Sequence, residues 1–400
     1  MELFMRDIVN PVTSSLEEYP MEELFKIKQK LINNNQKIYD FGVGDPNLPL
    51  WEPAIEALKQ SAGESQGYPS IGGTKELKEA CADYLLRRFC LKEDLSRLLV
   101  ATKGSKEAIF HIALSLIGRN GKQTVAYPAP GYPVYKSSVL FAQGVPYPVP
   151  LTEENHYLME PWNFPENVIK DLAAIWVNYP HNPTGTTVNI RYWEKLVEWC
   201  HREDVILLSD ESYVDLYHVL LDSEGEGSSK LPISPLVVSS DRVISFFSLS
   251  KRSGFTGLRT GFMAGDRRIL EPHLKARANF GLSTPVCIQK AAAKAWLDDK
   301  HVALRREIFS ERLDFAFEKL SQMKLLVEKP KVPFYLWLKI PEKLFQKDID
   351  FCLNLARDGV ITTPGRWLGS KEEHFFRLSL TLSLEDMGEA FDILRKHIIN

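Results

Sequence analysis

The chain has 400 residues and a formal net charge of -3, with 44% hydrophobic and 25% charged residues. This is the composition of a soluble globular protein with room for two domains, and the weak negative charge gives no electrostatic basis for binding nucleic acid. The opening stretch "MELFMRDIVN" lacks the basic-then-apolar order of a signal peptide, and no apolar run reaches the roughly 20 residues of a membrane helix. We therefore expect a soluble, intracellular protein without a membrane partner.

The five cysteines are scattered along the chain, odd in number, and contain no Cys-x-x-Cys pair. This pattern predicts neither a disulfide framework nor a zinc site. The nine histidines show no metal-ligand spacing, so we expect no metal. A reducing cytoplasm fits these features best.

Short apolar runs that end in polar or turn residues recur through the first two thirds of the chain, at 124–128, 173–180, 204–210, 242–250 and 261–266. The segments between them include stretches with apolar residues three or four positions apart, as in 191–204, which is typical of helices. Continuous apolar strands separated by helices predict a mostly parallel sheet that is covered on both faces. The predicted fold class is α/β.

The pattern changes after about residue 267. A long helical stretch at 301–323 precedes two strand-like runs, "PFYLWLKI" (333–340) and "FFRLSLTL" (375–382). We predict a large α/β domain at 45–285 and a small α+β domain formed by 1–44 and 286–400, joined by a helix around 285–299. The polar segment 221–235 is expected to be an exposed excursion.

Polar residues follow several of the predicted strands. Asn182 comes after 173–180, Asp210 and Tyr213 come at the end of 204–210, and Lys251 follows Ser248 at the end of 242–250. In open α/β sheets ligands bind beyond the carboxyl ends of the strands, so these groups are expected to converge. An amide, a carboxylate, a phenol, hydroxyls and a lysine together suit a phosphorylated, nitrogen-containing cofactor.

Each of these residues also has a purely structural interpretation. Lys251 taken alone is an exposed loop lysine, and Asp210 is a helix N-cap at a strand-to-helix turn. Asn182 is a turn former before Pro183. For His181, beside Asn182, a solvent-facing loop role is expected rather than catalysis.

Three motifs occur in a fixed order: "YPHNPTG" (179–185), "SDESY" (209–213) and "SLSKRSGFTGLRTGF" (248–262). In this order and spacing they resemble the fold-type-I pyridoxal-phosphate enzymes, specifically the class I/II aminotransferases. The resemblance runs from "FGVGDP" (41–46) to "FFRLSL" (375–380). It implies an aspartate aminotransferase-like fold, with a mostly parallel seven-stranded sheet in a large domain that binds pyridoxal 5'-phosphate and a smaller α+β domain.

The resemblance also implies catalytic roles. Lys251 would form the internal aldimine and then carry the proton between the substrate carbon and the cofactor carbon. Asp210 would face the pyridine nitrogen and keep it protonated. Asn182 and Tyr213 would hydrogen-bond the ring hydroxyl oxygen, and the Asn182–Pro183 bond would be cis.

The resemblance places further residues around the cofactor. Arg259 and Ser248 would bind its phosphate, together with the amides of Ser105 and Lys106 at a helix start. Tyr132 would stack on the ring. Without that context, "GSKE" is a capped helix start and Tyr132 is a core tyrosine.

Three residues would complete the site. Arg377 would grip the substrate carboxylate with its guanidinium fork, although a strand-edge ion pair is the alternative. Gly44 would let the backbone approach that carboxylate, although a turn glycine is the alternative. Tyr68 would reach the phosphate of a neighbouring subunit, which implies a homodimer with shared active sites.

The implied activity is transfer of an amino group between an amino acid and a 2-oxo acid. "SLSKRS" and "GLRTGFMAGD" are similar to the N-succinyl-diaminopimelate aminotransferases of lysine biosynthesis. Aspartate, LL-diaminopimelate and aromatic amino acids stay open as substrates. The alternatives are a carbon–sulfur β-lyase on the same fold and a non-catalytic cofactor-binding regulator.

Overall fold

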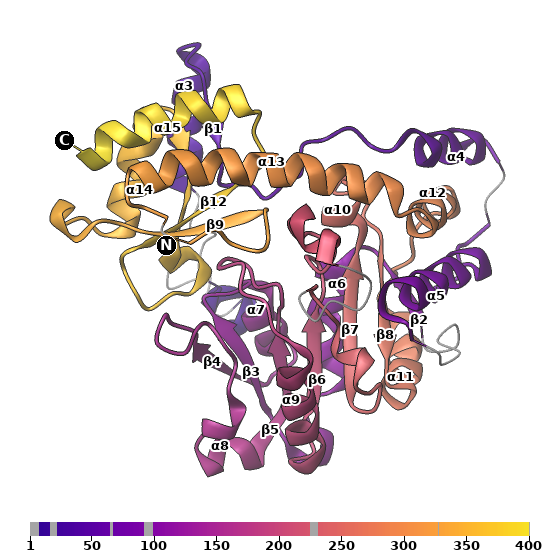
Figure 1. Ribbon diagram of the computed structural model, residues 1–400. Coiled ribbons are helices and arrows are strands. Elements are labelled where there is room, and N and C mark those ends of the chain that lie inside the picture. Colours follow the sequence, from indigo (N-terminus) through magenta and orange to yellow (C-terminus); the bar gives the residue numbers. More distant parts are fainter. Residues whose placement is uncertain are drawn as a thin grey trace.

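A seven-stranded sheet forms the centre of the computed structural model, which describes residues 8–16, 22–64, 67–91, 99–224, 231–326 and 328–399 (Figure 1). In spatial order the strands are β2 (Leu99–Thr102), β8 (Gly261–Gly265), β7 (Val243–Ser248), β6 (Ile206–Asp210), β5 (Leu172–Val177), β3 (Thr124–Ala129) and β4 (Val145–Pro150). All neighbouring pairs are parallel except the two that β8 makes. The predicted mostly parallel sheet is confirmed.

The two edge strands, β2 and β4, are missing from the sequence prediction. β4 has the sequence "VPYPVP". A central strand donates amide hydrogens to a neighbouring strand on each side, and proline has no amide hydrogen to donate. The strand tolerates them because it pairs with β3 on one side alone. β2 is four residues long and gives little periodic signal.

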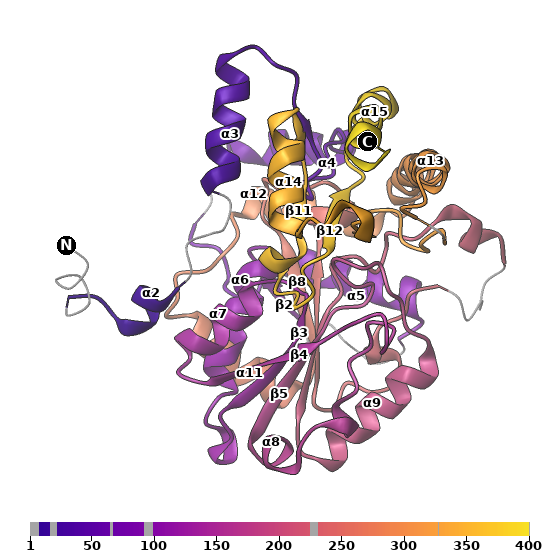
Figure 2. The same cartoon turned by 90° about the vertical axis from the view of Figure 1, so that its left-hand side faces the viewer.

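Helices cover both faces of this sheet (Figure 2). On one face, α5 (Lys75–Phe89), α9 (Ile190–Arg202) and α12 (Val286–Leu297) share a hydrophobic core with the strands, and α4 (Glu52–Ala62) packs on α12. On the other face lie α6 (Ser105–Ile112), α7 (Val134–Phe141) and α11 (Arg267–Arg277). Two short helices, α8 (Glu166–Asp171) and α10 (Leu249–Arg252), connect strands.

The last third of the chain builds a separate core. The predicted helix is α13 (Lys300–Gln322), which in Figure 1 runs from α12 toward a three-stranded antiparallel sheet. That sheet contains β11 (Thr363–Pro364), β12 (Phe375–Ser379) and β9 (Tyr335–Lys339), and it is flanked by α14 (Asp348–Arg357) and α15 (Leu384–Ile399). Because β9 and β12 fall inside the two strand-like runs, those predictions are confirmed.

Part of the N-terminal region packs with this C-terminal core. The strand β1 (Tyr39–Asp40) pairs with β10 (Val360–Ile361), and α3 (Glu22–Asn33) packs on α14; α2 (Pro11–Ser15) precedes them. Part of the N-terminal segment and the C-terminal third thus pack against each other. The exact boundaries 45–285, 1–44 and 286–400 stay a prediction.

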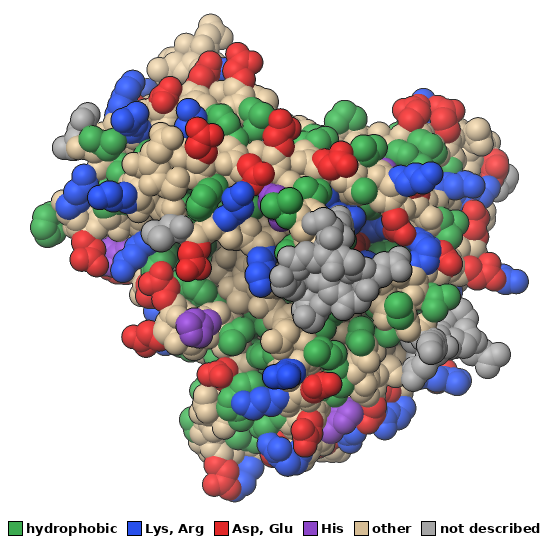
Figure 3. Space-filling view, viewed as in Figure 1, with side chains coloured by type: hydrophobic (Ala, Val, Ile, Leu, Met, Phe, Trp, Pro, Cys, Tyr) green, Lys and Arg blue, Asp and Glu red, His purple; other side chains and the backbone are tan. Residues whose placement is uncertain are grey.

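No helix within the described ranges is long and apolar enough to span a bilayer. On the face drawn in Figure 3, basic and acidic side chains are interspersed over the coloured, described surface. The expectation of an exposed excursion at 221–235 is wrong for its last residues, because Ser234 and Pro235 are buried under α9 and β7. Residues 225–230 lie outside the described ranges.

Candidate active site

Lys251 lies in α10, the single helical turn that begins directly after β7. The hydroxyl of Ser248 caps this turn by accepting a hydrogen bond from the amide of Ser250 at 3.1 Å. The Lys251 ammonium donates to the carbonyl oxygen of Gly44, so the structure brings these two predicted residues together. Burial lowers the pKa of Lys251, which favours the neutral, nucleophilic amine.

Asp210 ends β6, next to β7 in the sheet, and is buried. Its carboxylate accepts hydrogen bonds from the Ser212 hydroxyl at 2.6 Å, the Ser212 amide at 3.1 Å and the Tyr135 hydroxyl at 3.0 Å. A turn follows instead of an α-helix, so the N-cap interpretation is wrong. Burial raises the pKa of Asp210, while these hydrogen bonds and the charge of Lys251 oppose that rise.

Asn182 and Arg377 meet where the two cores adjoin. Arg377 donates to the Asn182 side-chain oxygen at 3.0 Å and to the Gly42 carbonyl oxygen at 2.8 Å. Among the described residues, its buried Nε has no hydrogen-bond partner. No carboxylate pairs with Arg377 in the described ranges, so the ion-pair alternative is not what the structure contains. An arginine held in place with a free donor is the chemistry that a carboxylate ligand requires. The Asn182–Pro183 bond is cis, as the resemblance implies.

Tyr213 is buried beside a tyrosine that the sequence analysis did not single out, Tyr335 of β9. Their hydroxyl oxygens are 3.3 Å apart, and the Tyr335 ring lies 4.3 Å from the guanidinium carbon of Arg377. A Cβ atom on Gly44 would overlap the Tyr335 hydroxyl, so only glycine fits there. Gly44 therefore serves close packing in the site. Tyr335 was missed because "PFYLWLKI" carries a strand signal alone, and strand pairing decides what its side chains touch.

The phosphate-binding candidates gather at the start of α6. Gly104, at the N-cap position, has a φ of 79°, and a Cβ there would fall 2.6 Å from an Arg259 nitrogen. Arg259 itself has a φ of 51°, an uncommon conformation for a non-glycine residue. Its guanidinium donates to the Thr256 carbonyl oxygen at 3.0 Å. The Arg259 guanidinium thus lies against the positive end of α6, and both features favour a negatively charged ligand.

Ser105 and Lys106 belong to the same end of α6. The Ser105 hydroxyl is 3.3 Å from that of Ser212, which links this helix start to the Asp210 turn. The Lys106 ammonium lies 5.9 Å from the ring centre of Tyr132. A cavity of about 320 Å³ is lined by Lys103, Lys106, Arg259 and neighbouring residues of α6 and α7. Anion binding at this helix start stays a prediction.

The expectation that His181 faces solvent is wrong. The imidazole is 2% exposed, with Nε2 3.1 Å from the Pro130 carbonyl oxygen and Nδ1 2.8 Å from the Thr184 hydroxyl. Burial lowers its pKa to about 4, so the ring is neutral at pH 7. A neutral ring with its proton on Nε2 satisfies both contacts and holds the loop that carries Asn182.

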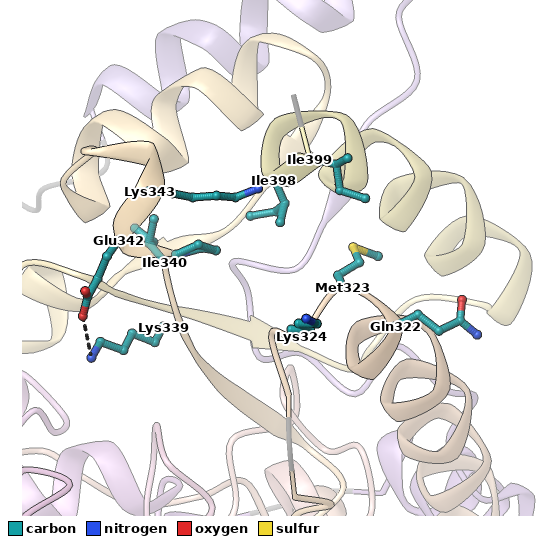
Figure 4. Close-up of a pocket in the computed structure, with 10 residues that line it drawn as sticks. Gln322, Met323, Lys324, Lys339, Ile340, Glu342, Lys343, Ile398 and Ile399 are labelled. Atoms are coloured by element: carbon teal, nitrogen blue, oxygen red, sulfur yellow. Dashed lines mark ion pairs between the residues drawn. The ribbon is translucent and has the colours of Figure 1, made fainter.

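Tyr68 does not join the other candidates within one chain. Its side chain is fully exposed, which leaves its predicted contact with a neighbouring subunit a prediction. Another hollow, of about 700 Å³, lies at the ends of α13 and α15, and none of the candidate residues lines it (Figure 4). Its lining is a mixture of isoleucines with lysines such as Lys339, which pairs with Glu342.

Glu211, next to Asp210, is a buried carboxyl without a cationic partner among the described residues. Its Oε1 accepts from the hydroxyls of Ser209 at 2.8 Å, Ser234 at 3.1 Å and Ser245 at 3.4 Å. Burial raises its pKa from 4.5 to about 8, so the folded chain holds it neutral at pH 7. Glu211 is not one of the candidate site residues described above.

Glu211→Gln is expected to stabilise the chain increasingly as pH rises. Between pH 4.5 and about 8 the unfolded carboxyl is charged while the folded one stays protonated. The parent therefore loses roughly 1 kcal/mol of unfolding free energy per pH unit relative to the glutamine variant. Urea unfolding should show the variant's advantage growing by about 3 kcal/mol from pH 5 to pH 8. A constant difference over this range would mean that Glu211 is already ionised in the fold.

The assembled groups fit a phosphorylated pyridine aldehyde. Lys251 supplies an amine, Asp210 a buried carboxylate for a ring nitrogen, and Tyr213 and Asn182 polar groups for a ring oxygen. Arg259 and the start of α6 supply anion donors. Most of these groups come at or after the ends of strands in one sheet, and Arg259 comes just before β8, which runs antiparallel to β7.

Comparisons with known proteins identify the family. The profile of the family described as "Aminotransferase class I and II" matches residues 36–394. An LL-diaminopimelate aminotransferase of Aquifex aeolicus is 34% identical over 384 residues, which is 95% of this chain and 96% of that protein. The corresponding protein of Syntrophobacter fumaroxidans is 31% identical over 384 residues, again 95% and 96% of the two chains.

Solved structures of aminotransferases also match this chain. The aminotransferase AspB of Helicobacter pylori matches with a TM-score of 0.83 and 28% identity, covering 96% of this chain and 100% of that one. A probable N-succinyldiaminopimelate aminotransferase of Thermus thermophilus matches with a TM-score of 0.82 and 25% identity, covering 94% and 98%. The fold, the ordered motifs and the family match agree along nearly the whole chain: it belongs to the class I and II aminotransferases and is a pyridoxal-phosphate-dependent transaminase.

Proposed function

We propose that this transaminase moves an amino group from a diaminopimelate-type amino acid, LL-diaminopimelate first among them, to a 2-oxo acid such as 2-oxoglutarate. The observation that carries the proposal is Arg377, a buried guanidinium with a free Nε, adjacent to Asn182 and to the Gly44–Lys251 contact. It provides a carboxylate site beside a nucleophilic amine. The choice of substrate rests on similarity to relatives named for LL-diaminopimelate.

Pyridoxal phosphate, when bound, supplies an aldehyde for the amino group and a pyridinium ring that takes up electrons from the substrate's α-carbon. We assign Lys251 to hold the cofactor and move the proton at that carbon. Asp210 keeps the ring nitrogen protonated, and Asn182 and Tyr213 orient the ring oxygen. Arg377 binds the substrate carboxylate.

The remaining assignments concern the rest of the cofactor. Arg259, Ser248, Ser105 and Lys106 are its phosphate donors, and Tyr132 covers the ring. The capping hydrogen bond of Ser248 uses its oxygen as an acceptor, which leaves the hydroxyl proton for the phosphate. A cytoplasmic location is supported by cysteines that are scattered, odd in number and without a Cys-x-x-Cys pair, as is usual in a reducing compartment.

A substrate panel tests the function. The chain loaded with pyridoxal phosphate is mixed in single turnovers with LL-diaminopimelate, N-succinyl-LL-diaminopimelate, aspartate, glutamate, phenylalanine and a cysteine S-conjugate. Conversion of the cofactor to its amine form is followed by absorbance. We expect LL-diaminopimelate to react fastest. Faster reaction with the N-succinyl compound would assign the other branch. Pyruvate release from cysteine conjugates without amine formation would identify a β-lyase, and no reaction with any compound would indicate a regulator.

Arg377→Lys is expected to lower kcat/KM for the amino donor by roughly 10- to 100-fold, because a lysine cannot form the paired hydrogen bonds of a guanidinium with a carboxylate. Cofactor retention should stay at the parent level. Arg119→Lys is the matched control, since Arg119 donates from Nη1 to both carboxylate oxygens of Asp204 and from Nη2 to the Asp204 carbonyl oxygen, just before β3 begins. Equal losses in both variants would argue against a carboxylate site at Arg377.

We further propose a homodimer in which Tyr68 completes the neighbour's phosphate site. Its exposed side chain has nothing to bind in its own chain's site. A phenol–phosphate hydrogen bond involves a charged acceptor, so Tyr68→Phe should weaken cofactor retention about 10- to 100-fold. This loss is measured by equilibrium dialysis of the cofactor.

A hybrid dimer tells whether Tyr68 acts across the subunit boundary. Parent subunits are mixed with a Tyr68→Phe, Lys251→Ala double variant, so that the hybrid's one site with an intact lysine receives the phenylalanine from its partner. That site should hold cofactor as poorly as Tyr68→Phe. Retention at the parent level would place Tyr68 outside the neighbour's site.

A further inference from the structure

Tyr335 lies among four groups of the site. Its hydroxyl is 3.3 Å from that of Tyr213 and packs against Gly44, whose carbonyl oxygen accepts from Lys251. Its ring faces Arg377 at 4.3 Å. These contacts position a second phenol next to the one assigned to the cofactor's ring oxygen.

The sheet holds Tyr335 firmly in this position. β9 pairs with β12 so that Trp337 lies opposite Arg377 and Tyr335 lies opposite Ser379. Residues two apart on a strand share a face, so Tyr335 and Arg377 are diagonal neighbours. The ring also packs edge-on against Tyr213 at 5.4 Å and Phe334 at 4.8 Å. A side chain that is 5% exposed and packed on three sides has little freedom to turn away.

The surrounding charges act differently on the two phenols. Burial raises the pKa of Tyr335, but Arg377 and Lys251 outweigh it and bring the pKa below its ordinary value. Burial raises the pKa of Tyr213 well above its ordinary value. A phenol carries a single proton, so if Tyr213 donates its proton to the cofactor's ring oxygen, the 3.3 Å contact between the two hydroxyls leaves Tyr335 as the donor and Tyr213 as the acceptor. The negative charge of Asp210 raises the pKa of both phenols, whereas the positive charge of Arg377 lowers it.

We propose that Tyr335 is a positioning residue that donates its hydroxyl proton to Tyr213 and so directs the proton of Tyr213 toward the cofactor's ring oxygen. The proposal rests on the proposed role of Tyr213. A phenol that accepts one hydrogen bond becomes a stronger donor in the next, because the bonds in a chain polarise one another. Tyr335 would thereby tune the cofactor bound to Lys251 without contacting it.

The test uses the pH dependence of the absorbance of the Lys251–cofactor linkage. A strong donor at the ring oxygen draws charge from it, and that charge otherwise stabilises the proton on the linkage nitrogen. Tyr335→Phe keeps the ring against Arg377 but removes the donor, so the pKa of the linkage should rise by about half a unit. In a Tyr213→Phe background the same change should have no effect, since the relay is already broken.

A matched control and a cofactor-free readout keep the test decisive. Tyr192→Phe removes a partly buried phenol hydroxyl on α9, bonded at 2.8 Å to the Met159 carbonyl oxygen, and should leave the linkage pKa unchanged. In the cofactor-free chain, carbon-13 NMR of labelled tyrosines should show Tyr335 ionising at lower pH than Tyr213. Lys251→Ala should raise the pKa of Tyr335, because a nearby positive charge is lost.

Two outcomes would overturn the proposal. An equal shift from Tyr335→Phe in both backgrounds would mean that the hydroxyl does not act through Tyr213. An unchanged linkage pKa, or an NMR order in which Tyr213 ionises first, would remove the donor role. Neither measurement uses an amino acid substrate, so a negative substrate panel would refute the proposed function and leave this inference standing.

Discussion

Lys251→Ala is expected to lower kcat by about 10⁴-fold or more, because the proposed function gives this one side chain both the amine that holds the cofactor and the base that moves the proton. The phosphate and ring contacts come from other residues, so the variant should still bind pyridoxal phosphate without a covalent bond. Steady-state kinetics with the best donor of the panel measures the loss.

Chemical trapping identifies the lysine directly. Borohydride reduction of the loaded parent chain, followed by peptide mapping, should attach the cofactor to Lys251 in the segment after β7. Lys290→Ala, which removes an α12 lysine paired with the exposed Glu64, is the control and should keep full activity and labelling. A label on any other lysine would refute the assignment.

Asp210→Asn is expected to slow proton abstraction by about 10²- to 10³-fold in single turnovers, the size of effect seen when one preorganised electrostatic contact is lost. The amide oxygen can still accept from Ser212, and the amide nitrogen that replaces Oδ2 can donate to the Tyr135 hydroxyl oxygen, so the local turn should survive. What is lost is the negative charge that keeps a proton on the ring nitrogen. Substrate affinity should change little.

The neighbouring carboxyl provides a matched control. Glu211→Gln replaces a group that is already neutral at pH 7, so single-turnover rates should stay at the parent value. A slow Glu211→Gln variant would point to a general disturbance of the turn. A fast Asp210→Asn variant would mean that Asp210 serves the turn alone.

The sequence itself predicted the large sheet and its central strands as elements. β3, β5, β6, β7 and β8 are runs of apolar residues whose ends carry polar groups, and burial on both faces imposes that composition. The candidates at the strand ends follow from the same logic, since carboxyl ends of parallel strands lie at one edge. For this reason Asp210, Ser248 and Lys251 could be expected to converge from residue order alone, while their roles came from the resemblance.

The order of the motifs was enough to indicate the family, while the fold determined the surroundings of individual residues. His181 stands in a polar motif and was expected in solvent, yet its loop is covered and the Pro130 carbonyl oxygen accepts its hydrogen bond. The edge strands β2 and β4 escaped notice because one-sided pairing relaxes the demands on their sequence. The burial of His181 and the pairing of β2 and β4 depend on which distant segments pack beside them, and the local sequence does not contain that information.

Tertiary structure alone brought Tyr335 and Gly42 to the site. Tyr335 reaches Arg377 because β9 pairs with β12 in one particular register, and a shift of one residue would turn its ring to the other face. Gly42 reaches Arg377 across 335 positions of the chain. The sequence thus determined the fold class, the family and the groups that directly follow buried strands, because burial and turn chemistry act over a few residues. Strand register and the packing of the two cores depend on contacts between distant segments. Only the folded chain therefore shows that Tyr335 lies beside Tyr213, and that Asn182 and Gly42 accept hydrogen bonds from Arg377.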